Sequence, residues 1–249
     1  MGFDGKVAVV TGAARSLGQD YASFFAREGA RVVVADIATD PACAHAEKLN
    51  ADGAEAIAVT VDVADEASTL AMAEAVNERF GRIDILVNNA GIWGDLEKHR
   101  LQEIPTEYWD TVMGVNVLGP LLCSRAVVPS MRANGWGRII NISSMGAYMT
   151  AGVYGVSKLA LNQLTYALAN ELGGDGITVN GVAPGTIANE ATKNQVPDTA
   201  IERLVNSSII KRAGTSEDIF GMIRYLSSDD AGWVTAQTFL VNGGFNTRL

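Results

Sequence analysis

A tyrosine and a lysine stand four positions apart, Tyr154 and Lys158, in the segment Tyr-Gly-Val-Ser-Lys. On a helix both side chains would lie on one face, one turn apart. A phenol with a pKa near 10 is a poor base at neutral pH, but an ammonium group within about 5 Å favours the phenolate. The spacing therefore indicates acid/base chemistry. Six tyrosines and six lysines would give about 0.14 such pairs by chance, so the motif needs support from other features.

A glycine-containing turn near the N-terminus has the composition of a phosphate-binding loop. The run Thr11-Gly12-Ala13-Ala14-Arg15-Ser16-Leu17-Gly18 joins an apolar, strand-like segment to a helical pattern. Glycines let the backbone pass close to a pyrophosphate, whose charge then rests on exposed helix N–H groups. The next apolar run ends in Asp36, 18 residues after Gly18, close to the spacing expected of a carboxylate that binds an adenosine ribose. A dinucleotide cleft is predicted, with a plain tight turn and a helix cap as the alternatives.

These residues sit in a regular alternation of short apolar runs and longer segments with helical period. Strands that are apolar on both faces and alternate with helices specify a parallel sheet covered on both sides. The predicted fold is therefore α/β, a single-domain Rossmann fold with a doubly wound sheet of about seven strands over residues 1–249. The predicted strands are Val7–Thr11, Arg31–Ala35, Ala56–Val61, Ile83–Val87, Arg138–Ile142, Ile177–Val182 and Thr238–Val241. The predicted helices are Leu17–Glu28, Pro41–Ala51, Glu66–Phe80, Thr106–Asn116, Pro120–Ala133, Val153–Leu172 and Ser216–Ser227.

One long connection breaks the alternation. About 30 residues separate the sixth predicted strand from the last helix, and they are rich in Asn, Thr and Pro. Connections of this length in a compact domain are typical of binding loops or of disordered segments. We expect a substrate-binding lid at about residues 186–213 that contains one or two short helices.

Composition excludes several classes of function. The formal charge is −9 and no cluster of Lys and Arg is present, which argues against nucleic-acid and anionic-membrane partners. The longest uncharged stretch, Ile139–Ser157, is interrupted by polar residues and glycines, and no signal peptide is evident, so we expect a cytoplasmic protein. Cys43 and Cys123 have no metal-ligand spacing; we expect one surface thiol, one packed thiol and no metal site.

Six features taken together resemble the short-chain dehydrogenase/reductase family. They are the glycine turn, Asn88-Asn89-Ala90-Gly91, Asn116, the Ser143-Ser144 pair, Tyr154-x-x-x-Lys158 and Pro184-Gly185, and their order covers the chain from Lys6 to about Gly244. The resemblance implies an NAD-dependent oxidoreductase in which Tyr154 is the acid/base and Lys158 lowers its pKa and holds the nicotinamide ribose. It further implies that Ser144 binds the substrate oxygen and that Asn116 anchors a water that relays the proton.

The resemblance also assigns the cofactor contacts. Asp36 would bind the adenosine ribose, Asp62 and Val63 the adenine, and Ile187 the nicotinamide carboxamide, although Asp62 would serve almost equally well as a helix cap. The cofactor-binding candidates are Gly12, Arg15, Ser16, Leu17, Gly18, Asp36, Asp62, Val63, Asn89, Ala90, Gly91, Tyr154, Lys158, Pro184, Gly185 and Ile187. The candidate substrate pocket is Trp93, Met145, Tyr148, Leu204 and Val205.

Three positions depart from the family pattern. One is Asn189, which stands where a threonine that contacts the nicotinamide amide is common, and whose side chain can make the same contact. Ser16 stands where the turn commonly has a glycine, and its Cβ would crowd a pyrophosphate or force an unusual backbone angle. The interval from Ser144 to Tyr154 is a few residues shorter than usual, which leaves the choice between Ser143 and Ser144 open and brings Tyr148 near the site.

The sequence therefore predicts hydride transfer between NAD(H) and a small hydrophobic secondary alcohol or ketone, because the pocket candidates are apolar and contain few cations. NADP is the less favoured cofactor, since a 2′-phosphate would face the Asp36 carboxylate. A 3-oxoacyl thioester reductase would share every catalytic residue, and a non-catalytic dinucleotide-binding module is the third alternative. A sugar-nucleotide epimerase would be expected to carry a larger C-terminal region. The apolar helices near Pro120–Met131 and Val153–Leu172 lead us to expect a homotetramer.

Overall fold

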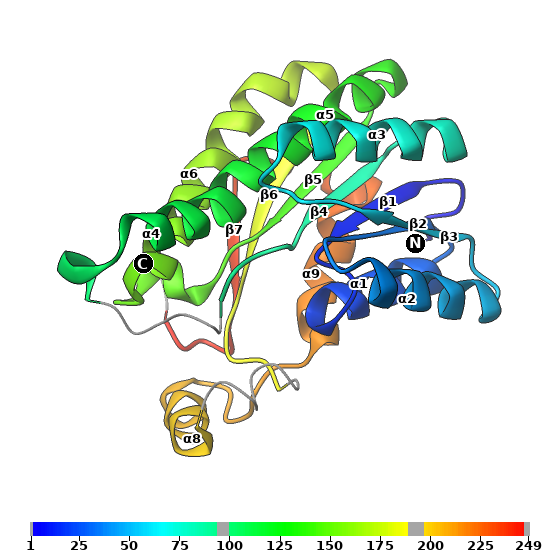
Figure 1. Ribbon diagram of the computed structural model, residues 1–249. Coiled ribbons are helices and arrows are strands. Elements are labelled where there is room, and N and C mark those ends of the chain that lie inside the picture. Colours follow the sequence, from blue (N-terminus) through cyan, green and yellow to red (C-terminus); the bar gives the residue numbers. More distant parts are fainter. Residues whose placement is uncertain (1, 94–99, 189–196, 247–249) are drawn as a thin grey trace.

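All seven strands of the protein belong to one parallel sheet in the order β3-β2-β1-β4-β5-β6-β7. The computed structural model describes residues 2–93, 100–188 and 197–246 (Figure 1). The strands are β1 Val7–Thr11, β2 Arg31–Asp36, β3 Ala56–Thr60, β4 Ile85–Asn88, β5 Gly137–Ile142, β6 Ile177–Pro184 and β7 Thr238–Val241. This strand order reverses direction between β1 and β4, which is where a doubly wound sheet opens a ligand crevice.

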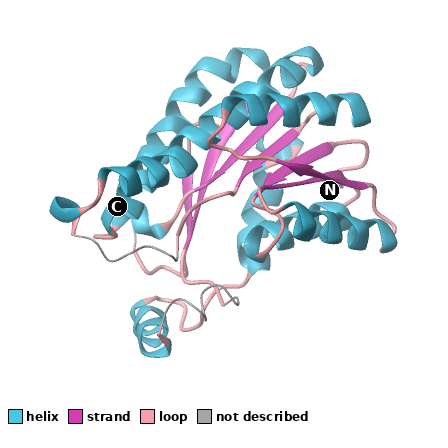
Figure 2. Cartoon of the chain, in the orientation of Figure 1, coloured by secondary structure: helices cyan, strands magenta, loops and turns pink. Residues whose placement is uncertain are grey.

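Helices cover both faces of the sheet (Figures 1 and 2). One layer holds α1 Ser16–Arg27, α2 Thr39–Ala51 and α9 Ser216–Leu226. The other layer holds α3 Glu66–Phe80, α4 Thr106–Met113, α5 Gly119–Asn134 and α6 Gly152–Leu172. A further helix, α8 Asp198–Ser207, stands apart from both layers in Figure 1. Short turns of 3-10 helix are η1 Leu101–Glu103, η3 Met145–Tyr148, η4 Gly173–Asp175 and η5 Asp229–Ala231, and η2 Gly114–Leu118 is a π-helical turn.

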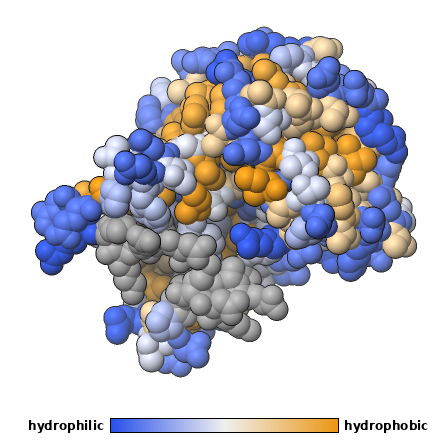
Figure 3. Space-filling view, in the orientation of Figure 1, coloured by the Kyte–Doolittle hydropathy of each residue, from blue (hydrophilic) through white to orange (hydrophobic). Residues whose placement is uncertain are grey.

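The apolar interior forms two clusters, one on each side of the sheet. Phe25 and Ile219 belong to the cluster under α1, α2 and α9, and Met72 and Val127 to the cluster under α3, α5 and α6. Alternate residues of each strand contribute to opposite clusters, as Val10 and Val9 of β1 do. Figure 3 shows hydrophobic residues reaching the surface over the upper helical layer among hydrophilic ones.

The predicted fold class and strand count are confirmed, and β1, β7 and α3 have the predicted bounds. The predicted break between two helices after Asn116 is wrong, because residues 106–134 form one continuous helical stretch interrupted only by the π-helical turn. Proline has no N–H, so Pro120 cannot donate to the Asn116 carbonyl four residues earlier, and a widened turn accommodates this position. Pro41 also differs from expectation, since α2 begins two residues before it at Thr39.

Helix α8 confirms one short helix in the predicted lid, of which residues 189–196 lie outside the described part of the chain. Within the described residues, the helical stretch 106–134 is long and apolar enough to cross a membrane, with a mean hydropathy of 1.5. However, 56% of its most apolar window is buried inside the fold, as is common for a core helix. Cys43 is exposed and Cys123 is buried, as expected, and burial raises the pKa of the Cys123 thiol to about 12.

Candidate active site

The predicted site residues gather at the carboxyl edge of the sheet. Because the strands are parallel and in register, the ends of β1, β2, β4 and β5 meet along one line. Helix α6 packs against β5, β6 and the turn η3 and brings its first two turns to this edge. Thr11, Asp36, Asn88, Ser144 and Tyr154 therefore come together although they span most of the chain.

Two glycines shape the turn after β1. Gly12 has a φ of +64°, and a Cβ on it would lie 2.8 Å from Ala90 Cα. A Cβ on Gly18 would lie only 2.1 Å from the Gly12 carbonyl oxygen, so no side chain fits there. Asn89 fixes the same turn because its Nδ2 donates to the carbonyls of Thr11 at 2.9 Å and Gly12 at 3.1 Å. The turn is thus built from close backbone approaches that only glycine allows.

Ser16 lies in the left-handed backbone region with a φ of 55°. The sequence predicted either crowding or an unusual backbone angle at this position, and the structure shows the unusual angle. A non-glycine residue in this conformation is destabilised by about 1 kcal/mol. Such strain is found at sites where the surrounding structure requires it.

Asp36 ends β2 with both carboxylate oxygens held by backbone amides. The Ala14 N–H donates to Oδ2 at 2.9 Å, and the Ala38 N–H donates to Oδ1 at 3.0 Å. Each oxygen keeps a second lone pair for a further donor. Arg15 is exposed at the start of α1, and Ile37 is 67% exposed immediately after Asp36. The carboxylate is therefore oriented in advance and remains partly exposed.

The turn and Asp36 fit a nicotinamide dinucleotide. Among the described residues, no side chain caps the N-terminus of α1 and no acidic residue lies in its first turn, so the positive end of the helix dipole can accept an anion. The ribose and pyrophosphate of a dinucleotide need, respectively, a carboxylate acceptor and exposed N–H donors, and Asp36 and α1 supply them.

The two residues predicted to contact the adenine, Asp62 and Val63, differ in their exposure. Asp62 is exposed, and its Oδ1 accepts from the Ala64 N–H at 2.9 Å, whereas the N-cap of α3 is Asp65. The alternative of Asp62 as the helix cap is therefore wrong by three residues. Val63 is 7% exposed and packs against the start of α5, where a Cβ on Gly119 would lie 2.8 Å from Val63 Cγ2.

Lys158 is 5% exposed, and its Nζ donates to the Ile142 carbonyl at 2.8 Å. The ammonium lies 5.8 Å from the centroid of the Tyr154 ring. Burial lowers the pKa of Lys158 to about 8 because the charged form loses its hydration. The last residue of β5 thus anchors the lysine beside the tyrosine.

Tyr154 forms a side-chain hydrogen bond with Ser144. Burial raises the pKa of Tyr154, and the bond from Ser144 opposes that shift by favouring the phenolate. The expectation that Lys158 lowers this pKa stays a prediction, since burial and Ser144 are the two influences found on the pKa of Tyr154. The Gly146 N–H donates to Ser144 Oγ at 3.0 Å, which leaves the hydroxyl hydrogen of Ser144 directed to the phenol.

Ser143 occupies a different environment from Ser144. It is 3% exposed, and its Oγ donates to the Lys158 carbonyl at 3.4 Å. The geometry therefore favours Ser144 as the serine at the reacting centre and makes Ser143 a support for α6.

Asn116 is fully buried in the π-helical turn. Its Oδ1 accepts from the Ile92 N–H at 2.8 Å, and its Nδ2 donates to the Ile92 carbonyl and to Ser157 Oγ, both at 3.0 Å. Gly91 lies between the two candidate residues, since a Cβ on it would be 3.3 Å from Asn116 Oδ1 and 3.4 Å from Lys158 Nζ. Asn116 bridges the β4 turn to α6, and its predicted role in holding a water stays a prediction.

Of the five predicted pocket residues, Val205 lines a cavity in the described part of the chain. Val205 and Ile187 line a cavity of about 160 Å³ between the end of β6 and helices α8 and α9. Its lining also contains Arg212 and Asp218, which form an ion pair at 2.6 Å, so charged side chains accompany the apolar ones in this cavity. The pair holds the pKa of Asp218 well below its usual range.

The other four pocket candidates lie elsewhere. Met145 and Tyr148 belong to η3 beside Tyr154, and the Tyr148 hydroxyl accepts from Asn162 Nδ2 at 2.8 Å. Leu204 is half-buried on α8, and Trp93 is 38% exposed. The common role of these residues as a substrate pocket stays a prediction.

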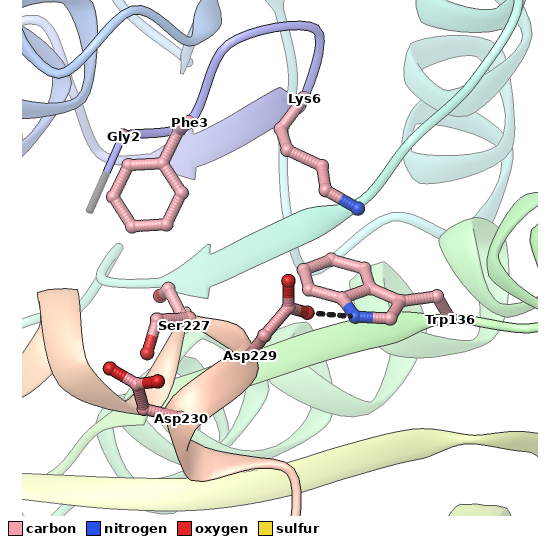
Figure 4. Close-up of a pocket in the computed structure, with 8 residues that line it drawn as sticks. Gly2, Phe3, Lys6, Trp136, Ser227, Asp229 and Asp230 are labelled. Atoms are coloured by element: carbon pink, nitrogen blue, oxygen red, sulfur yellow. Dashed lines mark hydrogen bonds between the residues drawn. The ribbon is translucent and has the colours of Figure 1, made fainter.

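A cavity of about 180 Å³ lies at the opposite, amino edge of the sheet (Figure 4). There Lys6 Nζ lies 3.5 Å from the centroid of the Trp136 ring, and Trp136 Nε1 donates to Asp229 at 2.9 Å. This cavity lies at the other end of the strands from Tyr154, between the N-terminal segment, Trp136 and the residues around η5.

Sequence reasoning missed two residues that hold the site. Thr11 Oγ1 accepts from the backbone N–H groups of Asn89 and Ala90 at 3.1 Å, which ties β1 to the β4 turn. Ser157 Oγ donates to the Tyr154 carbonyl at 2.8 Å and accepts from Asn116. Ser157 lies inside the Tyr-x-x-x-Lys motif, and this position is the sequence signal from which its role could have been predicted.

Comparisons with known proteins agree with this geometry. A family model described as enoyl-(acyl carrier protein) reductase matches residues 12–246. An uncharacterised oxidoreductase of Mycobacterium tuberculosis is 48% identical, over 97% of this chain and 98% of that protein. A 3-oxoacyl-(acyl-carrier-protein) reductase of Pseudomonas aeruginosa is 38% identical over 98% of both chains. The crystal structure of a gluconate 5-dehydrogenase from Burkholderia cenocepacia, in complex with NADP and tartrate, aligns with a TM-score of 0.92 at 32% identity, covering 98% of this chain and 96% of that one.

The chain belongs to the short-chain dehydrogenase/reductase family. It is an oxidoreductase of that family, with the fold that binds a nicotinamide dinucleotide.

Proposed function

We propose that the protein transfers a hydride between NAD(H) and a secondary alcohol or ketone, with Tyr154 as the acid/base. The observation that carries the proposal is the cluster of Ser144, Tyr154 and Lys158 beside the glycine turn. A ketone oxygen within reach of Tyr154 and Ser144 would receive the phenolic proton from one and a hydrogen bond from the other. The nicotinamide supplies the hydride chemistry.

Lys158 supports this role through its charge. As an ammonium it favours the phenolate in the direction of alcohol oxidation, when Tyr154 must accept a proton. Its anchor on the Ile142 carbonyl keeps the ammonium at the tyrosine, and Asn116 keeps the neighbouring turn in place.

The choice of NAD over NADP rests on Asp36. Its carboxylate stands at the end of β2, and the two positions after it are Ile37 and Ala38, which carry no charge. The Burkholderia structure holds NADP, so the preference has to be tested on this chain.

Replacing Tyr154 with Phe tests the proposed chemistry. The variant should bind NAD with nearly unchanged affinity and lose almost all hydride transfer, because only the proton path is removed. Stopped-flow absorbance of the reduced nicotinamide measures transfer, and calorimetry measures binding. A variant that kept a tenth of the wild-type rate would contradict the assignment.

A reductase of 3-oxoacyl thioesters is the second candidate, supported by the name of the Pseudomonas relative. It would use the same three residues on a longer, anionic substrate. The lining of the cavity beside α8 includes polar and charged side chains, Arg212 among them, so polar substrates belong in the screen with hydrophobic ketones. A comparison of turnover on cyclic ketones, hydroxy acids and acyl thioesters separates these substrate classes. A dinucleotide-binding module without catalysis is the third alternative, and turnover of any of them would exclude it.

We also propose a homotetramer. Helix α6 exposes a stripe at helical spacing, Val156, Leu159 and Tyr166, with exposures of 38%, 52% and 56%. Exposed apolar residues gathered on one face indicate an interface. Light scattering should give about four chain masses at micromolar concentration, and Leu159→Arg should lower that mass. A monomeric wild-type protein would refute the proposal.

A further inference from the structure

His45 is a buried histidine in direct contact with the cofactor turn. It lies on α2 and is 4% exposed. Its Nδ1 is 3.1 Å from the carbonyl oxygen of Ala13, the residue between Gly12 and Ala14 in the turn after β1. Its Nε2 is 3.1 Å from the hydroxyl of Ser23 on α1. The imidazole therefore links α2 to both the turn and the helix that begins the dinucleotide site.

The hydrogens available to these contacts are too few when the imidazole is neutral. The Ala13 carbonyl can only accept, so Nδ1 must carry a hydrogen. Neutral Nε2 can then only accept, which requires the Ser23 hydroxyl hydrogen. That hydrogen is already directed to the Gln19 carbonyl at 2.9 Å. One of the two contacts of Ser23 is lost in the neutral state.

Protonation removes this conflict. In the imidazolium both ring nitrogens donate, Nδ1 to Ala13 and Nε2 to the Ser23 oxygen, while Ser23 still donates to Gln19. All three hydrogen bonds are then satisfied at once. The opposing effect is burial, which is the largest influence and lowers the pKa of His45.

The charges around His45 come from each element that packs on it. Lys48 on its own helix lowers the pKa of His45, whereas Asp20 on α1 and the Ala13 carbonyl raise it. The turn itself contributes Arg15, which is exposed, and Asp36 reaches the same turn through the Ala14 N–H. The net effect on the pKa of His45 is a lowering, with burial as its main cause.

We propose that His45 is a positioning residue that couples proton uptake to dinucleotide binding at the glycine turn. The inference rests on the proposed cofactor role of this turn. A pyrophosphate seated there places negative charge in front of Ala13, with the imidazole behind it. The anion favours the imidazolium, and by linkage the imidazolium favours the anion. Dinucleotide affinity should therefore rise as the pH falls.

Two measurements test this coupling in the full-length protein. The chain has only two histidines, so imidazole resonances can be followed by NMR from about pH 5 to pH 8. Saturating NAD⁺ should raise the pKa of His45 by at least about half a unit, which corresponds to about threefold tighter binding at the acid end. Calorimetric titration with NAD⁺ should show that change in Kd. NAD⁺ is the probe because the 2′-phosphate of NADP⁺ would itself titrate near pH 6.

His45→Asn provides the matched variant, since its amide can still donate to the Ala13 carbonyl but cannot be protonated. It should keep the wild-type Kd at about pH 7.5 and lose the tightening at low pH. Ser23→Ala removes the acceptor of Nε2–H and should shift the pKa of His45 downward. His99→Gln, at the other histidine, should leave the pH dependence of Kd unchanged.

The outcomes separate the two hypotheses. If wild type and His45→Asn bind NAD⁺ with the same pH dependence, the coupling is refuted while the proposed function stands. If wild type binds neither NAD⁺ nor NADP⁺, the proposed function fails and the coupling fails with it. Should His45→Asn not fold, the wild-type NMR titration decides, because a His45 pKa unmoved by saturating NAD⁺ overturns the coupling.

Discussion

Removal of the charge at Asp36 should abolish most of the preference for NAD over NADP. In the structure both oxygens of this carboxylate are fixed by the N–H groups of Ala14 and Ala38, so the side chain cannot rotate away without losing two hydrogen bonds. A 2′-phosphate on the bound ribose would meet this fixed negative charge. The ribose hydroxyl that it replaces would have donated a hydrogen bond to the same oxygen.

The magnitude follows from charge and exposure. A phosphate monoester carries roughly −1.5 to −2 charges at neutral pH. Each unit charge about 4 Å from a carboxylate costs between about 1 kcal/mol in water and about 4 kcal/mol near a protein surface. Asp36 is half-buried, so we take the lower part of this range and expect about 2–4 kcal/mol of repulsion. Exposed Arg15 offsets at most about 1 kcal/mol. Loss of the hydrogen bond from the ribose hydroxyl to the charged carboxylate adds about 1.5–3 kcal/mol. Together these terms give a net preference for NAD of at least about a hundredfold in kcat/KM, or roughly 2.7 kcal/mol.

Steady-state kinetics with NADH and NADPH on one ketone, in one buffer, measures the preference directly. Asp36→Ser should remove most of it, and Asp36→Asn should do so while leaving an oxygen to accept from the backbone. Asp40→Asn removes an exposed carboxylate four residues further along the sequence; it is the matched control and should change the preference little. Because the effect is electrostatic and partly exposed, added salt should weaken the wild-type preference.

A wild-type enzyme that used NADPH as well as NADH in this assay would refute both the role of Asp36 and the choice of NAD. A preference that survived unchanged in both Asp36 variants would leave NAD as the cofactor and show that repulsion is not its cause.

Two stability predictions come from other residues. Lys158→Met should raise the free energy of unfolding at pH 7 by about 1–2 kcal/mol in chemical denaturation while abolishing activity, because burial of the ammonium opposes folding. Its folded pKa of about 8 lies below the reference value of 10.5, so the unfolded chain binds the extra proton between these values. The free energy of unfolding of the wild type should therefore rise relative to that of the variant as the pH rises through this window. A difference between the two that did not change with pH would contradict the buried charge. Ala236→Gly should stabilise by about 0.5–1 kcal/mol, since Ala236 has a φ of 62°, whereas Ala71→Gly within α3 should destabilise by about 1 kcal/mol. Thermal unfolding measures both changes. If Ala236→Gly and Ala71→Gly changed the stability in the same direction, the role of the backbone angle would be refuted.

Most of the fold could be predicted because its local signals agree with one another. Helix α3 begins and ends as predicted, with Asp65 capping one end and Gly81 at φ 74° closing the other. The helical stretch through Asn116 could not be predicted in this way. Pro120 indicated a helix start, and only packing against α3 and α6 shows that the helix continues through a π-helical turn.

The site was predictable where it depends on spacing along one element. The Tyr154–Lys158 pair needs only a helix, and Asp36 needs only a strand end. The anchor of Lys158 on Ile142, the burial that raises the pKa of Tyr154 and the contact of His45 with Ala13 all depend on packing between elements far apart in the sequence. No local pattern carries that information.

The sequence leaves open which serine of the pair, Ser143 or Ser144, faces Tyr154, and the packing of the fold decides between them. Both residues follow β5 in extended conformation: Ser143 continues the strand by donating its N–H to the Val182 carbonyl, and Ser144 has a φ of −162°. Successive extended residues point to opposite sides, so only one of the two hydroxyls can reach the phenol. Because the loop from the serines to Tyr154 is shorter than usual in the family, the spacing along the sequence does not identify which serine reaches the phenol. Because the Gly146 N–H donates to Ser144 Oγ, the chain turns back immediately after the strand, and η3 brings Ser144 to the ring of Tyr154. A Cβ on Gly146 would lie 3.1 Å from that ring, so the shortened loop is tolerated because position 146 is glycine.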